Sequence, residues 1–344
     1  MHTMQAFSRA SAALAAAALA VALPLGTVQA AQTYSMKISV PTIHDIPNAW
    51  IDGYAAALEK DSGGRIKVQV FPASQLGSIP RQIEGTQFGS IQCEVVPPEF
   101  MVGLDPRFQA LAAPGLVNSE GQAQRLAADP AVRKLMLGLG ADKGLHGVGL
   151  FFAEPNVLVS RTPLHTLADF KGKKIRIFAS PFQTVAFQRL GMTPVAMTLG
   201  DVVPALQEGT IDGSITGIGP VVNFHMIDTA KYVTQIDQPA IYIIAEVNRK
   251  WYEALPKDLQ QIVDQDGAKE DEAIDPIALK TRTEDLKKWT AAGGTLIQLS
   301  PAERTKMMNV LASVGPDVSK SNPKLAAAYE SIATAAKGSA VAAK

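Results

Sequence analysis

The chain of 344 residues has one cysteine, few histidines and no excess of charge of either sign. A single cysteine excludes an internal disulfide and a cysteine-rich zinc site. Cys93 stands between Gln92 and Glu94 in an expected strand, and we interpret it as a small core residue rather than a nucleophile. Because 32 basic residues balance 32 acidic ones, electrostatics gives no reason to expect nucleic acid or an anionic membrane as a partner.

Signature motifs of common enzyme classes are also missing. The chain has no His-Glu-x-x-His, no Gly-x-x-x-x-Gly-Lys-Ser/Thr and no Gly-x-Ser-x-Gly. Residues 138–144 approach a dinucleotide-binding fingerprint, but the third glycine comes one residue late and the segment precedes an expected strand. The five histidines are scattered and form no metal-binding pattern. We therefore predict a protein that is not an enzyme and uses no cofactor and no metal ion.

Residues 1–30 have the parts of a secretory signal peptide. Arg9 supplies the positive start, residues 12–23 an apolar run, and residues 28–30 a small-residue cleavage signal. The apolar run is too short to span a bilayer, and nothing after residue 31 resembles a transmembrane helix. We predict cleavage after Ala30, which would leave 314 exported residues with a net charge of −1, not inserted in the membrane.

Strand-like alternation and helix-like spacing follow one another along the rest of the chain, which predicts an α/β fold with helices covering sheets. Residues after 336 are expected to form a loose tail. A long helical stretch, 256–291, is expected to be interrupted at Gly267 and Pro276. The other expected helices are 49–59, 82–88, 182–190, 201–208, 301–314 and 324–336. The expected strands are 34–40, 66–71, 90–96, 175–178, 193–197, 211–216, 232–236, 241–246 and 295–299.

The segment with the most information is Lys-Gly-Lys-Lys-Ile-Arg, residues 171–176. In a strand, Ile175 and Ile177 share one face, and Arg176 and Phe178 point to the other. A guanidinium held on a strand can grip a carboxylate through two parallel hydrogen bonds. An arginine beside lysines is, however, more often a solvated surface charge. The residues alone leave both interpretations open.

Three groups of motifs occur in an order and spacing that resemble a known family. They are the run Asp-Ser-Gly-Gly-Arg-Ile-Lys-Val at the start of 61–77, the stretch 167–213 that ends in Ile-Asp-Gly, and the stretch 232–260. The last contains Tyr-Val-Thr, Asn-Arg-Lys-Trp-Tyr and Leu-Pro-Lys-Asp-Leu-Gln. Together they resemble the DctP-type substrate-binding proteins of tripartite ATP-independent periplasmic (TRAP) transporters, over residues 34–315.

The resemblance implies a two-lobed periplasmic-binding-protein fold, or Venus flytrap, with crossing strands and one long helix that spans both lobes. The expected lobes are residues 32–153 plus 242–281, and residues 154–241 plus 282–336, followed by the tail 337–344. A periplasmic monomer of this kind would capture a small organic acid in the cleft and deliver it to the small and large permease subunits. An extracytoplasmic sensor without a transport role is the alternative, and an exported enzyme is a more remote one.

Arg176 matches the arginine of the family's strand motif, so the resemblance implies that it anchors the ligand's carboxylate. Sialic-acid-binding members have a second arginine, an asparagine and a phenylalanine where this chain has Asn156, Thr216 and Leu199. Sialic acid is therefore not the expected ligand. Asn156 suits a neutral polar group, or a share in the same carboxylate.

Further candidates for ligand contact are His44, Phe152, Glu154, Phe178 and Asp237. His44 follows the first strand, at the end where open α/β sheets bind ligands. Phe152 could stack on the ligand, and Glu154 could accept a hydrogen bond from a hydroxyl or pair with Arg176. Phe152 also fits a core position, Glu154 a surface position and Asp237 a hinge position.

The sequence is compatible with two classes of ligand. An aromatic or branched monocarboxylate would suit the apolar side chains near Arg176, and a C4-dicarboxylate would place its second carboxylate on His44 or a lysine. Some members of the family bind their ligand through a metal ion. Here such an ion would fall to Glu94, Glu99 or Asp237, against the expectation that none is used.

Overall fold

The structure, a computed structural model, describes residues 32–341, so the predicted signal peptide lies outside the described residues. Everything below concerns the compact unit that begins at Thr33. Within the described residues, no helix is both long enough and apolar enough to cross a membrane.

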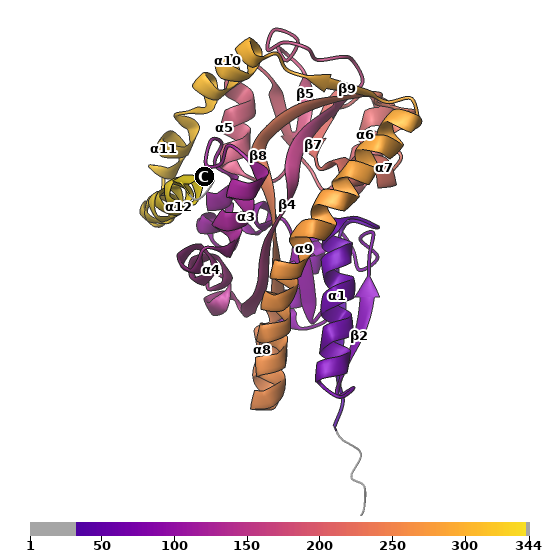
Figure 1. The fold of residues 1–344 in the computed structure, drawn as a ribbon, viewed down its shortest axis with the longest axis vertical. Helices are drawn as coiled ribbons and strands as arrows, with labels where there is room; N and C mark the ends of the chain where they lie inside the picture. Colours follow the sequence, from indigo (N-terminus) through magenta and orange to yellow (C-terminus); the bar gives the residue numbers. More distant parts are fainter. Residues whose placement is uncertain (1–31, 342–344) are drawn as a thin grey trace, which may run out of the picture. The chain divides into compact units, whose positions relative to one another are not determined.

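One mixed sheet runs through the described residues, in the order β2-β1-β3-β8-β4-β7-β5-β6, with β9 added beside β8 (Figure 1). Strands β4 and β8 are much longer than the rest and pair antiparallel from Leu145 opposite Asn248 to Ser160 opposite Tyr232. They therefore belong to both halves of the sheet. The strands are β1 (Tyr34–Ser39), β2 (Ile66–Phe71), β3 (Cys93–Val96), β4 (Leu145–Ser160), β5 (Lys174–Ile177), β6 (Thr193–Ala196), β7 (Gly213–Thr216), β8 (Tyr232–Asn248) and β9 (Thr295–Gln298).

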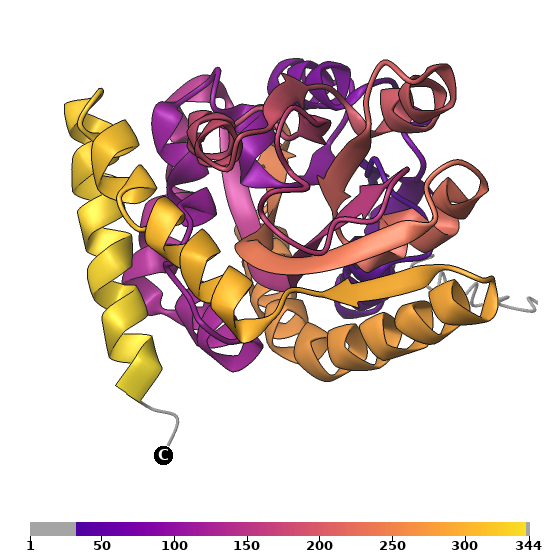
Figure 2. The same ribbon diagram turned by 90° about the horizontal axis from the view of Figure 1, so that it is seen from above.

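Helices cover both faces of this sheet. In Figure 2 the orange helix α9 and the yellow C-terminal helices lie along separate sides of the molecule. The predicted helices are all present, and α3, α4, α7, α8 and α11 are additions that the sequence did not indicate. The helices are α1 (Ile46–Asp61), α2 (Ile79–Phe88), α3 (Glu120–Ala128), α4 (Pro130–Leu137), α5 (Pro181–Arg189), α6 (Val202–Glu208), α7 (Ile218–Asn223), α8 (Arg249–Ala254), α9 (Lys257–Ala291), α10 (Pro301–Leu311), α11 (Val314–Ser319) and α12 (Pro323–Val341).

Two predictions about strands need correction. The expected strands 232–236 and 241–246 are one continuous strand, β8, and the 16-residue strand β4 was not predicted. In β4 every residue of 148–157 except Pro155 is buried. The strand therefore lacks the alternation of a half-exposed strand. A pattern search that relies on alternation therefore misses it.

The predicted loose tail is wrong for residues 337–341, because α12 continues to Val341. The helix is held by side chains of α3: Gln122 Nε2 donates to the carbonyl of Ala336 at 2.9 Å, and Arg125 Nε donates to the carbonyl of Ser339 at 2.8 Å. Residues 342–344 lie outside the described part.

The predicted interruption of the long helix is also absent, since α9 runs unbroken through Gly267 and Pro276. Gly267 lies against β4, where a Cβ atom would come within 2.3 Å of the backbone oxygen of Val148. The glycine therefore permits the helix to approach the strand, which is a packing role rather than a breaking one.

We expect Gly267→Ala to lower the free energy of unfolding by about 2–3 kcal/mol, because α9 must move away from β4 or strain against it. Urea unfolding followed by circular dichroism measures this. The matched control is Gly338→Ala in α12, where a Cβ atom meets nothing within 4 Å, and where alanine should stabilise slightly. Equal stability of Gly267→Ala and the wild type would contradict the packing role.

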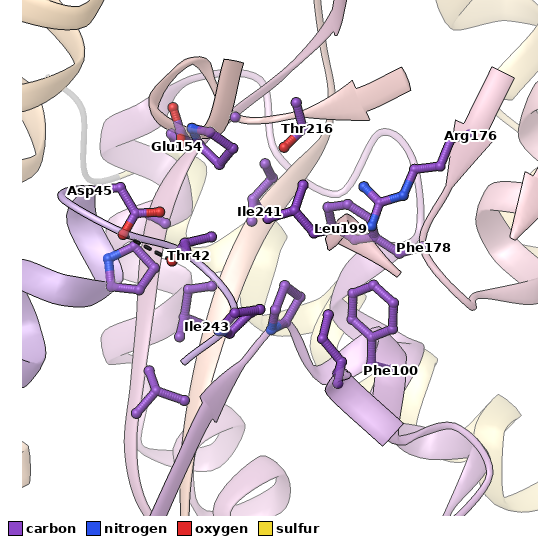
Figure 3. Close-up of a pocket in the computed structure, with 18 residues that line it drawn as sticks. Thr42, Asp45, Phe100, Glu154, Arg176, Phe178, Leu199, Thr216, Ile241 and Ile243 are labelled. Atoms are coloured by element: carbon purple, nitrogen blue, oxygen red, sulfur yellow. Dashed lines mark hydrogen bonds between the residues drawn. The ribbon is translucent and has the colours of Figure 1, made fainter. Parts of the chain in front are cut away.

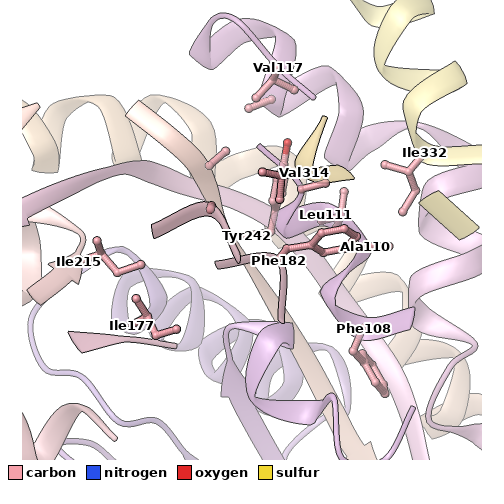
Figure 4. Packing of buried hydrophobic residues seen from close by; sticks show 14 of the residues in the cluster. Phe108, Ala110, Leu111, Val117, Ile177, Phe182, Ile215, Tyr242, Val314 and Ile332 are labelled. Atoms are coloured by element: carbon pink, nitrogen blue, oxygen red, sulfur yellow. The ribbon is translucent and has the colours of Figure 1, made fainter. Parts of the chain in front are cut away.

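The largest hydrophobic cluster fills the space between the sheet and the helices α5, α11 and α12 (Figure 4). Phe182 of α5 and Tyr242 of β8 are fully buried there, together with Val314 and Ile332. Phe152 belongs to the same cluster, with its ring 6.0 Å from that of Tyr242. This packing fixes the middle of β4 and β8, where the cavity described next is located.

Candidate functional site

A cavity of about 50 Å³, partly open to solvent, lies beside the middle of β4 and β8 (Figure 3). Residues from both halves of the sheet surround it. One wall comes from the loop between β1 and α1 and from the end of β3, and the other from β5, β7 and α7. Its lining is mostly apolar with a few placed polar groups, as is typical of sites for small ligands.

Arg176, on β5, is the single basic residue that lines the cavity, and it is 1% exposed. Its Nε donates to the carbonyl of Met197 at 2.9 Å and its Nη1 to the carbonyl of Ile215 at 3.1 Å. The guanidinium carbon lies 4.8 Å from the centre of the Phe178 ring and 5.9 Å from that of Phe100. The predicted strand thus sends Arg176 inward, not to the surface.

Among the described residues no carboxylate forms an ion pair with Arg176, and the charge of the exposed Asp201 only partly offsets the effect of burial on its pKa. Desolvation by burial lowers the pKa of the Arg176 guanidinium to about 9. A buried cation without a counterion is costly, so its presence beside a cavity indicates a place for an anion.

The opposite side of the cavity is acidic. Asp45 caps the N-terminus of α1, and its Oδ1 accepts hydrogen bonds from the Thr42 hydroxyl at 3.0 Å and from the backbone and side-chain nitrogens of Asn48. Glu154 of β4 accepts a hydrogen bond from the backbone nitrogen of Ile218, at the start of α7, through its Oε2 at 2.8 Å. Burial raises the pKa of Asp45 to about 6 and that of Glu154 to about 8.

Comparison with known families gives this geometry a context. The model of the DctP family, bacterial extracellular solute-binding protein family 7, matches residues 44–321. The chain belongs to this family. The two-lobed α/β fold and the relation to TRAP substrate-binding proteins that the sequence predicted are therefore confirmed, whereas the residue boundaries of the two lobes stay a prediction.

Individual DctP-family relatives are distant. The chain is 29% identical over 208 residues to the uncharacterized protein YiiZ of Salmonella typhimurium, covering 60% of this chain and 64% of that protein. It is 25% identical over 315 residues to the C4-dicarboxylate-binding periplasmic protein DctP of Rhodobacter capsulatus, covering 86% and 93%. Among solved structures, the sugar acid binding protein DctPAm of Advenella mimigardefordensis, in complex with galactonate, is similar with a TM-score of 0.84 at 21% identity, covering 90% and 99%.

Five of the predicted site residues line the cavity: Arg176, Thr216, Leu199, Glu154 and Phe178. All five are buried, and they come from β5, β7, β4 and the segments that follow β5 and β6. The structure thus brings together residues that are up to 62 positions apart in the sequence. Their roles in binding stay predictions.

Three other predicted residues lie elsewhere. Asn156 is fully buried where β4 meets β8, and its Nδ2 donates to the carbonyl of Pro239 at 2.6 Å. Phe152 is a core residue, and its ring lies 5.7 Å below the guanidinium carbon of Arg282. His44 is exposed with a positive φ of 54°, and only its backbone oxygen makes a contact, with Asn223 Nδ2 at 3.0 Å.

The side chain of Asp237 lies outside the described residues. Glu94 and Glu99, the other acidic candidates, are buried away from the cavity. In the part of the chain that the structure describes, no three histidine, cysteine or acidic side chains are placed to hold a metal ion together.

Sequence reasoning missed several lining residues. Asp45 is not among the predicted site residues, although an aspartate that precedes a proline-containing helix is a recognisable N-cap. The Asp45 carboxyl, and not the His44 imidazole, faces the cavity. Phe100, in a short 3-10 helix (Pro98–Met101), and Ile241 and Ile243, on β8, gave no signal that separates them from core residues.

Proposed function

We propose that this protein is the extracytoplasmic binding protein of a TRAP transporter and that it captures a small organic acid in the cavity, with Arg176 holding the carboxylate. The observation that carries the proposal is the buried guanidinium of Arg176, which has two hydrogen bonds to carbonyls and no acidic partner among the described residues. A carboxylate entering the cavity supplies that partner through charge-assisted hydrogen bonds.

The surroundings of Arg176 strengthen this interaction. Phe100 and Phe178 flank the guanidinium, and Leu199 closes the lining next to it. Because these groups exclude water, the attraction between guanidinium and carboxylate is weakly screened. Cleft closure over the ligand is expected to use the contact between Asn223 of α7 and the His44 backbone, which joins the two sides of the cavity.

The remaining parts of the proposal follow from the family. A cleaved signal peptide would place the protein in the periplasm, and the bound acid would pass to the small and large membrane subunits of the transporter. The relatives support this role, since one is named as a periplasmic binding protein for C4-dicarboxylates and another as a sugar acid binding protein.

A thermal-shift panel tests the proposal. Purified protein lacking residues 1–30 is mixed with organic acids, and each acid is matched by its primary amide. We expect at least one acid to raise the unfolding temperature with the logarithm of its concentration, and its amide to have no effect. If amides bind as well as their acids, or if no mono-, di- or sugar acid binds, the carboxylate anchor is wrong.

A further inference from the structure

We propose that Asp45 and Glu154 form a second subsite that receives a hydroxyl group of the ligand and rejects a second carboxylate. The ligand class that fits is a hydroxylated monocarboxylate of the aldonate type. This inference rests on the proposed function, because it assumes that Arg176 binds the ligand's single carboxylate.

The two subsites occupy different sides of one cavity. In Figure 3, Arg176 projects from β5 on one side, whereas Asp45, Thr42 and Glu154 stand on the other. Ile241 and the other apolar side chains between them offer no hydrogen bonds. A ligand that reaches across the cavity therefore presents its carboxylate to a cation and its far end to two carboxyl groups.

Unused hydrogen-bonding capacity remains on the acidic side. Asp45 uses Oδ1 for three hydrogen bonds, and Glu154 uses Oε2 for one, whereas Asp45 Oδ2 and Glu154 Oε1 accept none from a described residue. Glu154 Oε1 lies over the backbone of α7's first turn, where a Cβ atom on Gly217 would come within 1.7 Å of it. A hydroxyl suits these oxygens because it can donate to one and accept from the other when that one is protonated.

The charge of the lining disfavours a dianion. Among the residues that line the cavity, Arg176 is the one cation, and neither a lysine nor a histidine faces Asp45 and Glu154. Near neutral pH a second carboxylate would thus meet the like charge of Asp45, and such a juxtaposition costs several kcal/mol. The sequence left open a C4-dicarboxylate whose second carboxylate would bind to His44. The structure gives this no support, because His44 does not line the cavity.

Protonation gives the two carboxyl groups different roles. Burial is the main reason that the pKa of Glu154 rises to about 8, and the neighbouring Asp45 and Asp285 raise it further, against a lowering by Arg282 and by the hydrogen bond from Ile218. Near neutral pH the Glu154 carboxyl therefore carries a proton that it can donate to a hydroxyl oxygen. Asp45, with a pKa of about 6, remains mostly an acceptor.

Matched sugar acids test the proposal. Galactonate and galactarate differ only at C6, which is a hydroxymethyl group in the first and a carboxylate in the second. By calorimetry at about pH 7.5, we expect wild-type protein to bind galactonate, or its epimer gluconate, at least about 100-fold more tightly than the corresponding diacid. Asp45→Asn should reduce that ratio at least about tenfold, because the Asp45 carboxyl, with its pKa of about 6, is ionised at this pH, whereas the amide carries no charge and can donate to a carboxylate.

Two variants separate this inference from the proposed function. Arg176→Met should lose both the monoacid and the diacid, which tests the carboxylate anchor alone. Glu284→Gln removes the same charge at an exposed position of α9 and should leave the ratio unchanged. A wild-type preference for the diacid, a ratio unaffected by Asp45→Asn, or binding of neither sugar acid while other acids bind with their amides silent, would each overturn the hydroxyl subsite.

Discussion

Replacing Arg176 by methionine should weaken binding of the acid ligand by about 100- to 1,000-fold or more. The guanidinium supplies the counter-charge and the donors in a buried cavity, and removing one partner of such a pair costs about 3–5 kcal/mol. Methionine keeps an unbranched chain of similar length, so the loss would not come from a large change of volume. Calorimetric titration with an acid identified in the thermal-shift panel measures it.

The same substitution should cost the unliganded protein little stability. The buried guanidinium of Arg176 is poorly solvated, as its lowered pKa of about 9 shows, so the variant gains by removing an uncompensated charge. It loses the hydrogen bonds to Met197 and Ile215, which offsets part of that gain. Wild-type affinity in Arg176→Met would refute the anchor role. Arg176→Lys, which keeps the charge but not the planar fork of donors, should bind with intermediate affinity.

Arg176 shows which features of the site the sequence alone predicts. Alternation correctly placed it on a strand, opposite to Ile175 and Ile177, but alternation cannot say which face of a strand is buried when both faces are covered. In the structure all three side chains are buried. The family motif supplied the missing information, since it marks the arginine as the recurrent ligand contact.

The acidic side of the cavity shows what local patterns cannot supply. Asp45 and Glu154 are 109 residues apart, and they approach one another only because β4 crosses the sheet and α7 packs against the loop that holds Asp45. Conversely, Asn156 is two residues from Glu154 and was expected to face the ligand. Its placement changes because the pairing of β4 with β8 shifts between Pro155 and Val157, an irregularity that no alternation predicts.

A second buried acidic pair lies apart from the cavity, on the face of the sheet that α2 covers. Glu94 of β3 stands directly opposite Glu246 of β8, and Ser39 of β1 is the neighbour of Glu94 on its other side. Both carboxyl groups are fully buried, and none of their four oxygens, nor the hydroxyl of Ser39, has a hydrogen-bond partner in the described structure. Since the Ser39 hydroxyl supplies one donor and ionised carboxylates supply none, protons held on the carboxyl groups provide the further donors that these oxygens need.

Protonation of this pair predicts a stability that falls as pH rises. Burial raises the pKa of Glu94 well above its ordinary value of 4.5, and burial and then the Glu94 charge do the same for Glu246. Above about pH 4.5 the unfolded chain has lost these protons while the folded protein keeps them. Each retained proton therefore lowers the free energy of unfolding by about 1.4 kcal/mol per pH unit until the folded-state pKa is reached.

The double variant Glu94→Gln, Glu246→Gln should flatten this pH dependence between about pH 5 and pH 9. Its amides can donate to the unpartnered oxygens around them at every pH, so the variant should gain on the wild type by about 1.4 kcal/mol per pH unit for each carboxyl group that keeps its proton. Glu99 and Glu154, whose pKa values burial raises to about 8, have the same sign but are present in both proteins, so they cancel in the difference.

Urea unfolding at a series of pH values makes this comparison, with Glu84→Gln on the exposed side of α2 as the control for the loss of a carboxylate. Carboxyl groups with lowered pKa values, such as those of Asp105 and Asp258, contribute only below about pH 4 and leave the window unaffected. A double variant with the same pH slope as the wild type would mean that Glu94 and Glu246 do not retain protons. A reduced slope would show that Glu94 of β3 and Glu246 of β8 are protonated in the folded protein. The free energy of unfolding would then fall at alkaline pH because this pair loses its protons on unfolding.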